Sequence, residues 1–269
     1  MSRPIQIIVS IFYHVDAIKA VFDTILKQDR LANDIFVIEN PSSYTESDIK
    51  PFIMDLMDKG HIKKYFLTDR NITHHATKMV LLDKHVNFLK TDYIMITNGN
   101  ISTQDTTWLD QEIGLLEKFP KLFMTAVPLN MDNMPSGKDG YVLPMHGTNS
   151  TKEYDYGFTG KHMMLFRSHE FKTMMDVILK KGDYIDADIH NYMKTHGKTC
   201  GVLFNPKFHR HTWDLYKEKN DPYIAVKESY TLDEFWGHNE YCGYTVFRPG
   251  TSPFRIERTD NKKFILENV

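Results

Sequence analysis

Residues 5–12 read IQIIVSIF, and this stretch decides the fold. It is an almost unbroken apolar run rich in Ile and Val, which is typical of a strand buried on both faces of a parallel sheet. Residues 16–28 follow with apolar side chains at helical spacing. The same alternation continues along the chain, where we predict strands at 34–39, 62–67, 92–97 and 121–127 and helices at 46–59, 74–90 and 106–118.

This alternation of strand and helix predicts an α/β fold, with a mostly parallel central sheet flanked by helices. In sheets of this kind, ligands bind at the carboxyl ends of the strands. We therefore expect the polar residues that follow Phe12, Ile38 and Ile96 to converge on one site.

The pattern changes after residue 128. Residues 128–155 have no clear period and are interpreted as a long loop or short hairpins. Beyond them we predict a strand at 158–167, helices at 169–181 and 185–196, and a strand at 199–204. Residues 206–269 are polar, aromatic and irregular in pattern, and we expect an ordered extension there.

Composition excludes several classes of protein. The 269 residues include 33 basic and 35 acidic side chains, a formal net charge of −2, so nucleic-acid binding through bulk positive charge is not expected. The two cysteines cannot form a disulfide framework and indicate a reducing compartment. No apolar run has the length of a transmembrane span. We expect a cytoplasmic protein that reaches a membrane only by recruitment.

Three common nucleotide and hydrolase motifs are absent from the sequence. No GxGxxG follows the first strand, and no GxxxxGK[ST] occurs, so a standard dinucleotide site or P-loop is not predicted. No GxSxG occurs either, which removes the nucleophile elbow of an α/β-hydrolase.

Polar residues at two strand ends are candidates for ligand binding. Glu39 ends the predicted strand 34–39, where its carboxylate could accept hydrogen bonds from a nucleobase or ribose, or could belong to a loop that caps the next helix. Asn98-Gly99-Asn100 follows the strand 92–97. These amides could touch a sugar, a phosphate or a metal-bound water, or could form an ordinary Asn-Gly turn.

Two further groups come later in the chain. Asp183, Asp186 and Asp188 precede or open the helix 185–196, and they could include a general base or could simply cap the helix. His209 and His211 flank Arg210, and in an extended segment their side chains point the same way. That pair could ligate a metal or contact a diphosphate, and it could equally be an ordinary surface feature.

Taken in order, these features resemble the GT-A-fold glycosyltransferases, a large family that uses nucleotide-sugar donors. The resemblance covers residues 4–213. It begins with an acid at the end of the second strand (Glu39), a helix after an Asn-rich turn (Asn71 to Asn87) and a strand that ends where the family has D-x-D (Asn98-Gly99-Asn100). A helix that starts with Trp-Leu (Trp108-Leu109) and a Gly-containing strand (Gly157 to Arg167) follow. Last come an acidic motif (Ile185-Asp186-Ala187-Asp188-Ile189) before a helix that ends in Gly197, and a His, which is His209 or His211.

The resemblance implies an enzyme that transfers a hexosyl or pentosyl unit from a nucleoside-diphosphate donor to a glycan or other hydroxyl acceptor, with inversion. Asp186 corresponds to the general base that deprotonates the acceptor hydroxyl. The residues predicted to bind the donor are Tyr13, Glu39, Lys78, Asn98 and Asn100. The residues predicted on the acceptor side are Gly160, Asp188 and Trp213. Residues 1–213 then form the glycosyltransferase domain, and residues 214–269 form an extension packed on it.

The sequence departs from the family at D-x-D, where Asn98 and Asn100 replace the acids that bind Mn²⁺ or Mg²⁺. The two amides could contact the donor without metal, or they could hold a weakly bound metal through Asn100 with His209 and His211. In a third interpretation, donor turnover has been lost. A non-catalytic nucleotide-sugar or carbohydrate-binding domain is therefore the alternative function, and an unrelated nucleotidyltransferase is a third. Aromatic residues in the segment 213–247 could stack on sugar rings or pack the extension onto the domain.

Overall fold

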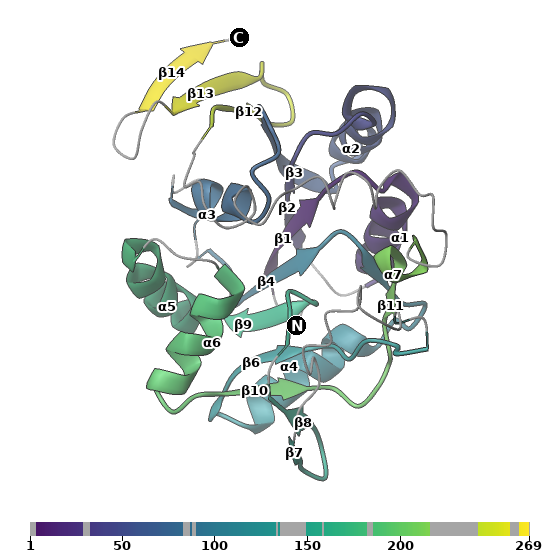
Figure 1. Cartoon of the computed structure of the whole chain (residues 1–269), viewed down its shortest axis with the longest axis vertical. Coiled ribbons are helices and arrows are strands. Elements are labelled where there is room, and N and C mark those ends of the chain that lie inside the picture. Colours follow the sequence, from purple (N-terminus) through teal and green to yellow (C-terminus); the bar gives the residue numbers. More distant parts are fainter. Residues whose placement is uncertain are drawn as a thin grey trace.

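The computed structural model describes residues 4–28, 33–82, 87, 90–132, 134, 149–157, 159–181, 185–215, 242–258 and 264–268. Its main feature is a 12-stranded sheet in the order β14-β13-β12-β3-β2-β1-β4-β9-β6-β10-β8-β7 (Figure 1). The strands of this sheet are β1 (Ile5–Ile11), β2 (Asn33–Glu39), β3 (Ile62–Thr68), β4 (Tyr93–Asn98), β6 (Leu122–Ala126), β7 (Asn149–Ser150), β8 (Asp155–Tyr156), β9 (Met164–Arg167), β10 (Thr199–Val202), β12 (Tyr244–Phe247), β13 (Phe254–Arg258) and β14 (Phe264–Asn268). A second, two-stranded sheet joins β5 (Ile101–Ser102) to β11 (His209–Arg210).

The centre of the large sheet is parallel. β1 pairs in parallel with both β2 and β4, and β2 pairs in parallel with β3. β9 then lies antiparallel between β4 and β6, so the sheet as a whole is mixed. Along β1 nearly every side chain is buried, as the apolar run at 5–12 predicts for a strand covered on both faces. The α/β fold class is confirmed.

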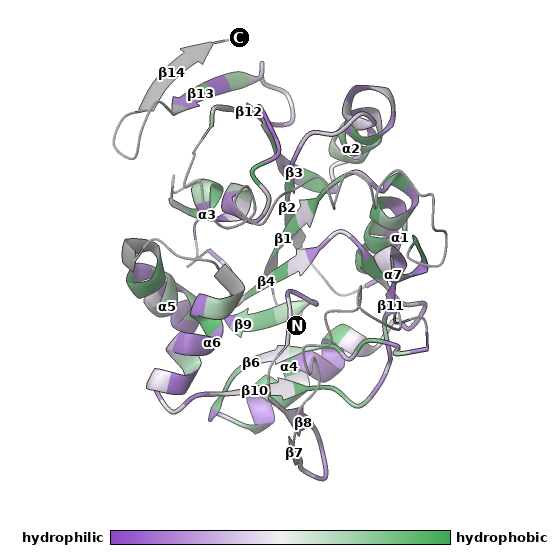
Figure 2. Ribbon diagram, viewed as in Figure 1, coloured by the Kyte–Doolittle hydropathy of each residue, from purple (hydrophilic) through white to green (hydrophobic). Residues whose placement is uncertain are grey.

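Helices cover both faces of the sheet and give the molecule three layers. They are α1 (Val15–Leu26), α2 (Lys50–Asp58), α3 (His75–Leu82), α4 (Trp108–Lys118), α5 (Ser168–Lys181), α6 (Ile185–Thr195) and α7 (His211–Leu215). The core on one face includes side chains from α1, α2, α4 and α7. The core on the other face includes side chains from α3, α5 and α6, which lie together to the left of the sheet in Figure 1. Figure 2 shows hydrophobic residues along the central strands and hydrophilic residues on the outer turns of the helices.

Several predicted boundaries were wrong. Of the predicted strand 158–167, Phe158 lies outside the described residues and β9 begins only at Met164. Met163 has a left-handed φ of 50°, and His162 N donates to Gly160 O at 2.7 Å in a tight turn before the strand. The predicted helix 46–59 begins with a π-helical segment, η1 (Thr45–Ile49), before α2. Of the predicted helix 74–90, α3 accounts for His75–Leu82, and most of the rest lies outside the described residues.

The segment 206–269 is more regular than its sequence pattern indicates. It contains β11, α7 and a three-stranded addition to the large sheet, β12-β13-β14. β12 pairs antiparallel with β3, with Tyr244 opposite Thr68 and Phe247 opposite Tyr65. Arg255 holds this addition to the end of β3 through two hydrogen bonds to Asp69, at 2.8 and 2.6 Å. The division of the chain at residue 213 stays a prediction.

None of the helices in the described part of the chain is both long enough and apolar enough to cross a lipid bilayer.

Candidate functional site

The carboxyl ends of β1 and β4 meet at Gly99. Gly99 N donates to Ser10 O at 2.7 Å, and Asn98 N donates to Lys161 O at 3.1 Å. A Cβ atom on Gly99 would lie 2.6 Å from Ile11 Cγ2 and 3.2 Å from Ser10 O, so only glycine fits against β1 at this position. The Asn-Gly-Asn segment is therefore a tight strand-end connection that fixes where Asn98 and Asn100 leave the sheet.

Tyr13 follows the end of β1 in a backbone conformation that is rare for a residue with a side chain. Its φ is 63°, and its ring packs edge-on against Tyr44, with the centroids 5.1 Å apart. Left-handed φ values in residues other than glycine cost energy and are concentrated at functional sites. The next residue, His14, caps α1 by accepting a hydrogen bond on Nδ1 from Ala17 N at 3.2 Å.

Asn100 connects this strand end to the segment that carries the predicted metal-binding histidines. Its carbonyl oxygen accepts from His211 N at 3.0 Å, and its Nδ2 donates to Thr212 Oγ1 at 3.4 Å. Asn100 Oδ1 is buried and has no hydrogen-bond partner among the described residues. The antiparallel pairing of β5 with β11, which sets Ser102 opposite His209, holds the two segments in register.

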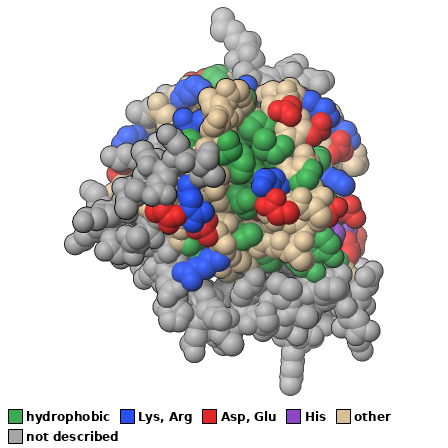
Figure 3. Space-filling model, turned by 90° about the horizontal axis from the view of Figure 1, so that it is seen from above, with side chains coloured by type: hydrophobic (Ala, Val, Ile, Leu, Met, Phe, Trp, Pro, Cys, Tyr) green, Lys and Arg blue, Asp and Glu red, His purple; other side chains and the backbone are tan. Residues whose placement is uncertain are grey.

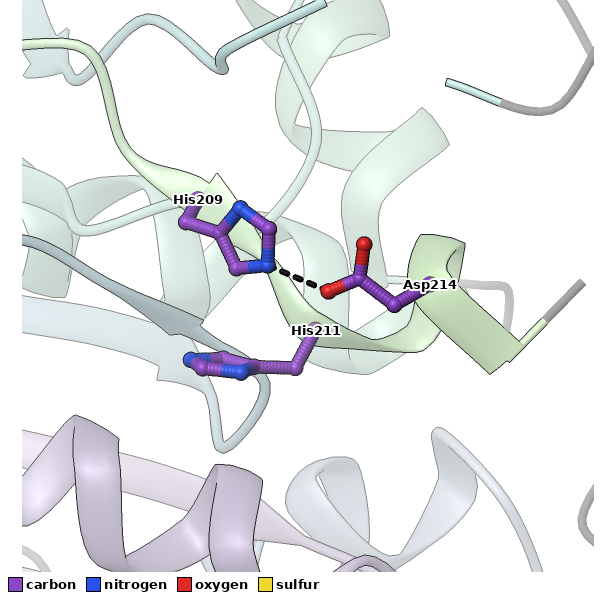
Figure 4. A group of neighbouring side chains, drawn as sticks. All are labelled: His209, His211 and Asp214. Carbon is purple, nitrogen blue, oxygen red and sulfur yellow. Dashed lines mark hydrogen bonds and ion pairs between the residues drawn. The ribbon is translucent and has the colours of Figure 1, made fainter. Parts of the chain in front are cut away.

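Two histidines and one carboxylate gather at the start of α7. His209 Nε2 bonds Asp214 Oδ2, and the rings of His209 and His211 lie edge to face with centroids 4.9 Å apart (Figure 4). One potential ligand atom from each of His209, His211 and Asp214 lies within 4.8 Å of the others. Neighbouring imidazole and carboxylate groups are the arrangement that binds divalent transition metals in proteins.

Packing holds the His211 ring in place and keeps it neutral. Ser102 Oγ lies 2.8 Å from His211 Nε2. Burial, together with the nearby His209 and His14, lowers the pKa of His211 to about 4. The imidazole is therefore uncharged at pH 7, the form that can donate a lone pair to a metal.

Glu39 lies at the end of β2 and is fully buried. Thr45 Oγ1 donates to one carboxylate oxygen and Tyr65 OH to the other, both at 2.5 Å. Burial raises the pKa of this carboxyl above its usual 4.5, and the two hydrogen bonds oppose that rise. Its predicted contact with a nucleobase or ribose stays a prediction. In the structure both carboxylate oxygens bond protein hydroxyl groups.

Lysine and histidine side chains gather at the start of α3. Lys78 and Lys161 are almost fully buried, with exposed fractions of 2% and 4%. Burial lowers the pKa of His74 to about 2, and the neighbouring basic groups of His75, Lys161 and Lys78 add to this effect. Lys161 O also receives the hydrogen bond from Asn98, so this basic group adjoins the strand-end connection. Lys78 was predicted from the sequence, and Lys161 was not.

The acidic motif lies in the first turns of α6. Asp186 is the second residue of this helix, and its side chain and Asp183 lie outside the described residues. His190, one turn later, contacts Thr159 O at 2.7 Å through Nε2. Thr159 adjoins Gly160, whose added Cβ would lie 2.9 Å from the ring of His162. The turn before β9 thus links the middle of α6, at His190, to the end of β4.

The remaining residues that the sequence predicted for the site are Asp188, Trp213 and four other aromatic residues. Asp188 is half-buried on α6. Trp213 is buried in the core on the α1 side, and the guanidinium of Arg210 lies 5.1 Å from the centre of its ring. Tyr216, Tyr223, Phe235 and Trp236, the other aromatic candidates for stacking, lie outside the described residues.

Sequence reasoning missed Asp214 and Ser102. The signal for Asp214 was present as the spacing H-x-H-x-x-D over residues 209–214, because residues three apart share one side of a helix. Ser102 carried no signal, because its proximity to His211 arises only from the pairing of β5 with β11.

No model of a known protein family matches the chain. The chain is similar to uncharacterized proteins of Acanthamoeba polyphaga mimivirus. It is 27% identical to protein L137 over 242 residues, which cover 86% of this chain and 33% of L137. It is 27% identical to protein L142 over 252 residues, which cover 91% of this chain and 51% of L142. The chain therefore spans about a third of the first relative and about half of the second.

Among solved structures, the chain is similar to the mannosyltransferase PcManGT of Pyrobaculum calidifontis, determined in complex with GDP-mannose and Mn²⁺. The TM-score is 0.51 at 15% sequence identity, over 76% of this chain and 57% of the mannosyltransferase. At this level of identity the similarity shows the fold alone. The α/β architecture with its central sheet is thus the GT-A-type, Rossmann-like fold that the family resemblance implied.

Proposed function

We propose that this chain is a glycosyltransferase that transfers a sugar, hexosyl or pentosyl, from a nucleoside-diphosphate donor to a hydroxyl group of a glycan or glycoconjugate. The observation that carries the proposal is the strand-end connection at Gly99. It gathers Asn98 and Asn100, the histidine segment and the buried Lys161 at the carboxyl edge of β1 and β4 in a GT-A-type sheet. Ligands bind at this edge in open α/β sheets.

In this proposal the donor diphosphate lies against Asn98 and Asn100, with Lys78 nearby. The chain has no broad positive charge, with a net charge of −2, so a few placed groups must neutralise the diphosphate. Tyr13 and Glu39 belong to the nucleoside side. A divalent cation, Mn²⁺ or Mg²⁺, would offset the negative charge that develops on the leaving diphosphate. Asn100, His209 and His211 are the residues predicted to hold it.

Asp186 is proposed as the general base. A carboxylate in the first turn of α6 can remove the proton from the acceptor hydroxyl as its oxygen attacks the anomeric carbon. The bond from that carbon to the diphosphate oxygen breaks on the opposite face, which inverts the configuration. The link from α6 through His190 and Thr159 toward the end of β4 supports this role. The acceptor would approach past Gly160 and Asp188, whereas Trp213, also predicted on the acceptor side, is buried in the core on the α1 face.

The test is Asp186→Asn in the full chain. Removing a general base is expected to lower sugar transfer, or donor hydrolysis, by about 100- to 10,000-fold. Binding of the donor should be nearly unchanged, because the base touches the acceptor. Both are measured with a panel of UDP-, GDP- and dTDP-sugars, binding by thermal shift and turnover by release of the nucleoside diphosphate.

The matched control is Asp176→Asn, which changes an exposed carboxylate on the neighbouring α5. Wild-type turnover in Asp186→Asn would remove Asp186 from the mechanism. Repeating the turnover assay in excess EDTA separates a metal-dependent enzyme from one in which the amides and lysines alone bind the diphosphate.

The alternative function is a nucleotide-sugar- or carbohydrate-binding domain without turnover. Two observations favour it: the neutral side chains of Asn98 and Asn100 stand where acids are expected, and the Glu39 carboxylate bonds protein hydroxyls on both oxygens. Donor binding in the thermal-shift panel with no release of nucleoside diphosphate from any donor would support this alternative.

A further inference from the structure

A short segment at the junction of β11 and α7 builds a compact group of metal-ligating side chains. β11 ends at Arg210 and α7 begins at His211, so the chain turns from strand to helix within the sequence His209–Asp214. The helix brings Asp214, three residues after His211, onto the same side as that histidine. Figure 4 shows His209 and Asp214 directed at each other and His211 beneath them.

Neighbouring residues fix the position of His211 within this group. His211 has Ser102 Oγ 2.8 Å from its Nε2, and an outer hydrogen bond of this kind fixes the orientation of a metal-ligating imidazole. The backbone N of His211 donates a hydrogen bond to Asn100 O at 3.0 Å, which fixes the backbone of this histidine. The Oδ1 atom of Asn100, next to this segment, is buried without a hydrogen-bond partner among the described residues.

We propose that His209, His211 and Asp214 bind one divalent transition-metal ion, and that Asp214 supplies the carboxylate ligand that the Asn98-Gly99-Asn100 segment lacks. In this proposal the carboxylate ligand comes from α7, which follows the histidines, and not from the strand end. The part of the proposal that concerns Asn98 and Asn100 rests on the proposed function. The binding of metal does not, because it concerns only the three ligands.

The donor set determines which ion the site prefers. Imidazole nitrogens suit Zn²⁺ and a carboxylate oxygen suits Mn²⁺, so a site with both kinds of ligand can hold either ion, whereas Mg²⁺ prefers an all-oxygen octahedral shell that includes several waters. We therefore expect Mn²⁺ and Zn²⁺ to bind and Mg²⁺ to bind far more weakly. A site based on two strand-end carboxylates would show much less discrimination against Mg²⁺.

The experiment uses the full chain without an affinity tag, stripped of metal with a chelator, in the absence of any nucleotide. Mn²⁺ is titrated and its free concentration is followed by the six-line electron paramagnetic resonance signal. Thermal shifts are recorded in parallel with Mn²⁺, Zn²⁺ and Mg²⁺. We expect one Mn²⁺ per chain and a rise in melting temperature with Mn²⁺ and Zn²⁺ that Mg²⁺ at the same concentration does not give.

Two variants and one control identify the ligands. Asp214→Asn and His209→Gln should each weaken Mn²⁺ binding by at least about tenfold, since even residues outside the ligand shell contribute 10- to 100-fold. Asp58→Asn, which changes an exposed acid on α2, should bind Mn²⁺ like the wild type. Melting curves recorded without metal establish whether each variant is folded. If Asp214→Asn does not fold, the Mn²⁺ affinity of His209→Gln tests the proposal.

Two results would overturn the proposal: neither Mn²⁺ binding nor a Zn²⁺-dependent rise in melting temperature in the wild-type chain at millimolar metal, or unchanged metal affinity in the folded variants. Its failure is distinguishable from failure of the proposed function. A chain that binds Mn²⁺ but neither binds nor turns over any nucleotide sugar leaves the metal site intact and removes the glycosyltransferase. Sugar transfer that persists in a chain unable to bind metal would remove the metal site and leave the proposed glycosyltransferase activity intact.

Discussion

Gly99 is the residue at which the sheet and the candidate site are joined most closely. Its amide bonds Ser10 O, and the space that a side chain would need is filled by Ile11 and the backbone of β1. The side chains on either side of it, Asn98 and Asn100, leave the sheet in directions set by this contact. A change here should therefore affect stability and ligand binding together.

We predict that Gly99→Ala destabilises the folded chain by about 1–3 kcal/mol, because the new methyl group meets atoms that cannot all move away. Gly114→Ala is the matched control. Gly114 lies in α4 with open space around it, so the same change should stabilise the chain by about 0.5–1 kcal/mol. Chemical denaturation measures both free energies of unfolding. Equal effects of the two substitutions would contradict the close approach at Gly99.

The buried carboxyl of Glu39 predicts a pH dependence of stability. Its pKa is raised above 4.5 in the folded state by burial, so between the unfolded and folded pKa values the folded chain holds a proton that the unfolded chain has released. The stability contributed by this group is complete below about pH 4.5 and is lost as the pH rises through the folded pKa. The glutamine side chain in Glu39→Gln cannot titrate, so this variant does not lose stability at position 39 as the pH rises.

We therefore expect the wild type to lose unfolding free energy relative to Glu39→Gln as the pH is raised above about 4.5. The exposed Glu153, changed to Gln, serves as the control and should leave the pH profile of the wild type nearly unaltered. Parallel profiles for the wild type and Glu39→Gln would show that burial does not perturb this carboxyl.

At the scale of elements, the spacing of hydrophobic residues predicted the positions of most strands and helices. The strand 5–12 and the helix 16–28 are β1 and α1 within one or two residues, because a continuous apolar run suits a buried strand and a 3.6-residue period suits a helix packed on one side. The predicted strand 158–167 began too early, because a tight turn at Gly160–His162 and the left-handed residue Met163 come before β9. The identity of a residue as methionine does not indicate a left-handed φ.

The candidate site was predictable only where it depends on strand ends. Asn98-Gly99-Asn100 follows a recognisable strand, so its place at the edge of the sheet could be expected from the sequence. The grouping of Asp214 and Ser102 with the histidines depends on β5 pairing with β11, two-residue strands more than 100 positions apart in the chain. Pairings this short leave no periodic signal.

The strand β12 offers a test of how firmly the last part of the chain is joined to the sheet. Tyr244 is fully buried there, and its ring lies 6.2 Å from that of Phe66 on β3. Tyr244→Ala should cost about 3–5 kcal/mol, the range for removing a large buried ring. Thr245→Ala, a half-buried change on the same strand, is the control. If the tyrosine variant unfolds with wild-type stability, the extension packs independently of the domain.

At the scale of the whole molecule, the charges are dispersed. Figure 3 shows Lys, Arg, Asp and Glu side chains interspersed around an area of hydrophobic side chains on one face. This agrees with the near balance of 33 basic and 35 acidic residues. A polyanion held by general attraction would need a continuous basic surface. A diphosphate held by a few placed side chains does not, so the dispersed charge is compatible with the proposed donor.

The pairing of β12 with β3 has a consequence for how the chain matures during synthesis. β3 leaves the ribosome before β12, because 175 residues separate Thr68 from Tyr244, so one edge of the parallel core has no partner from this addition until β12 has been made. An uncovered edge strand invites pairing with other chains. Lys63 and Lys64 on β3 carry charge along that edge in the interval, and a nascent chain released too early would be exposed to aggregation at this strand.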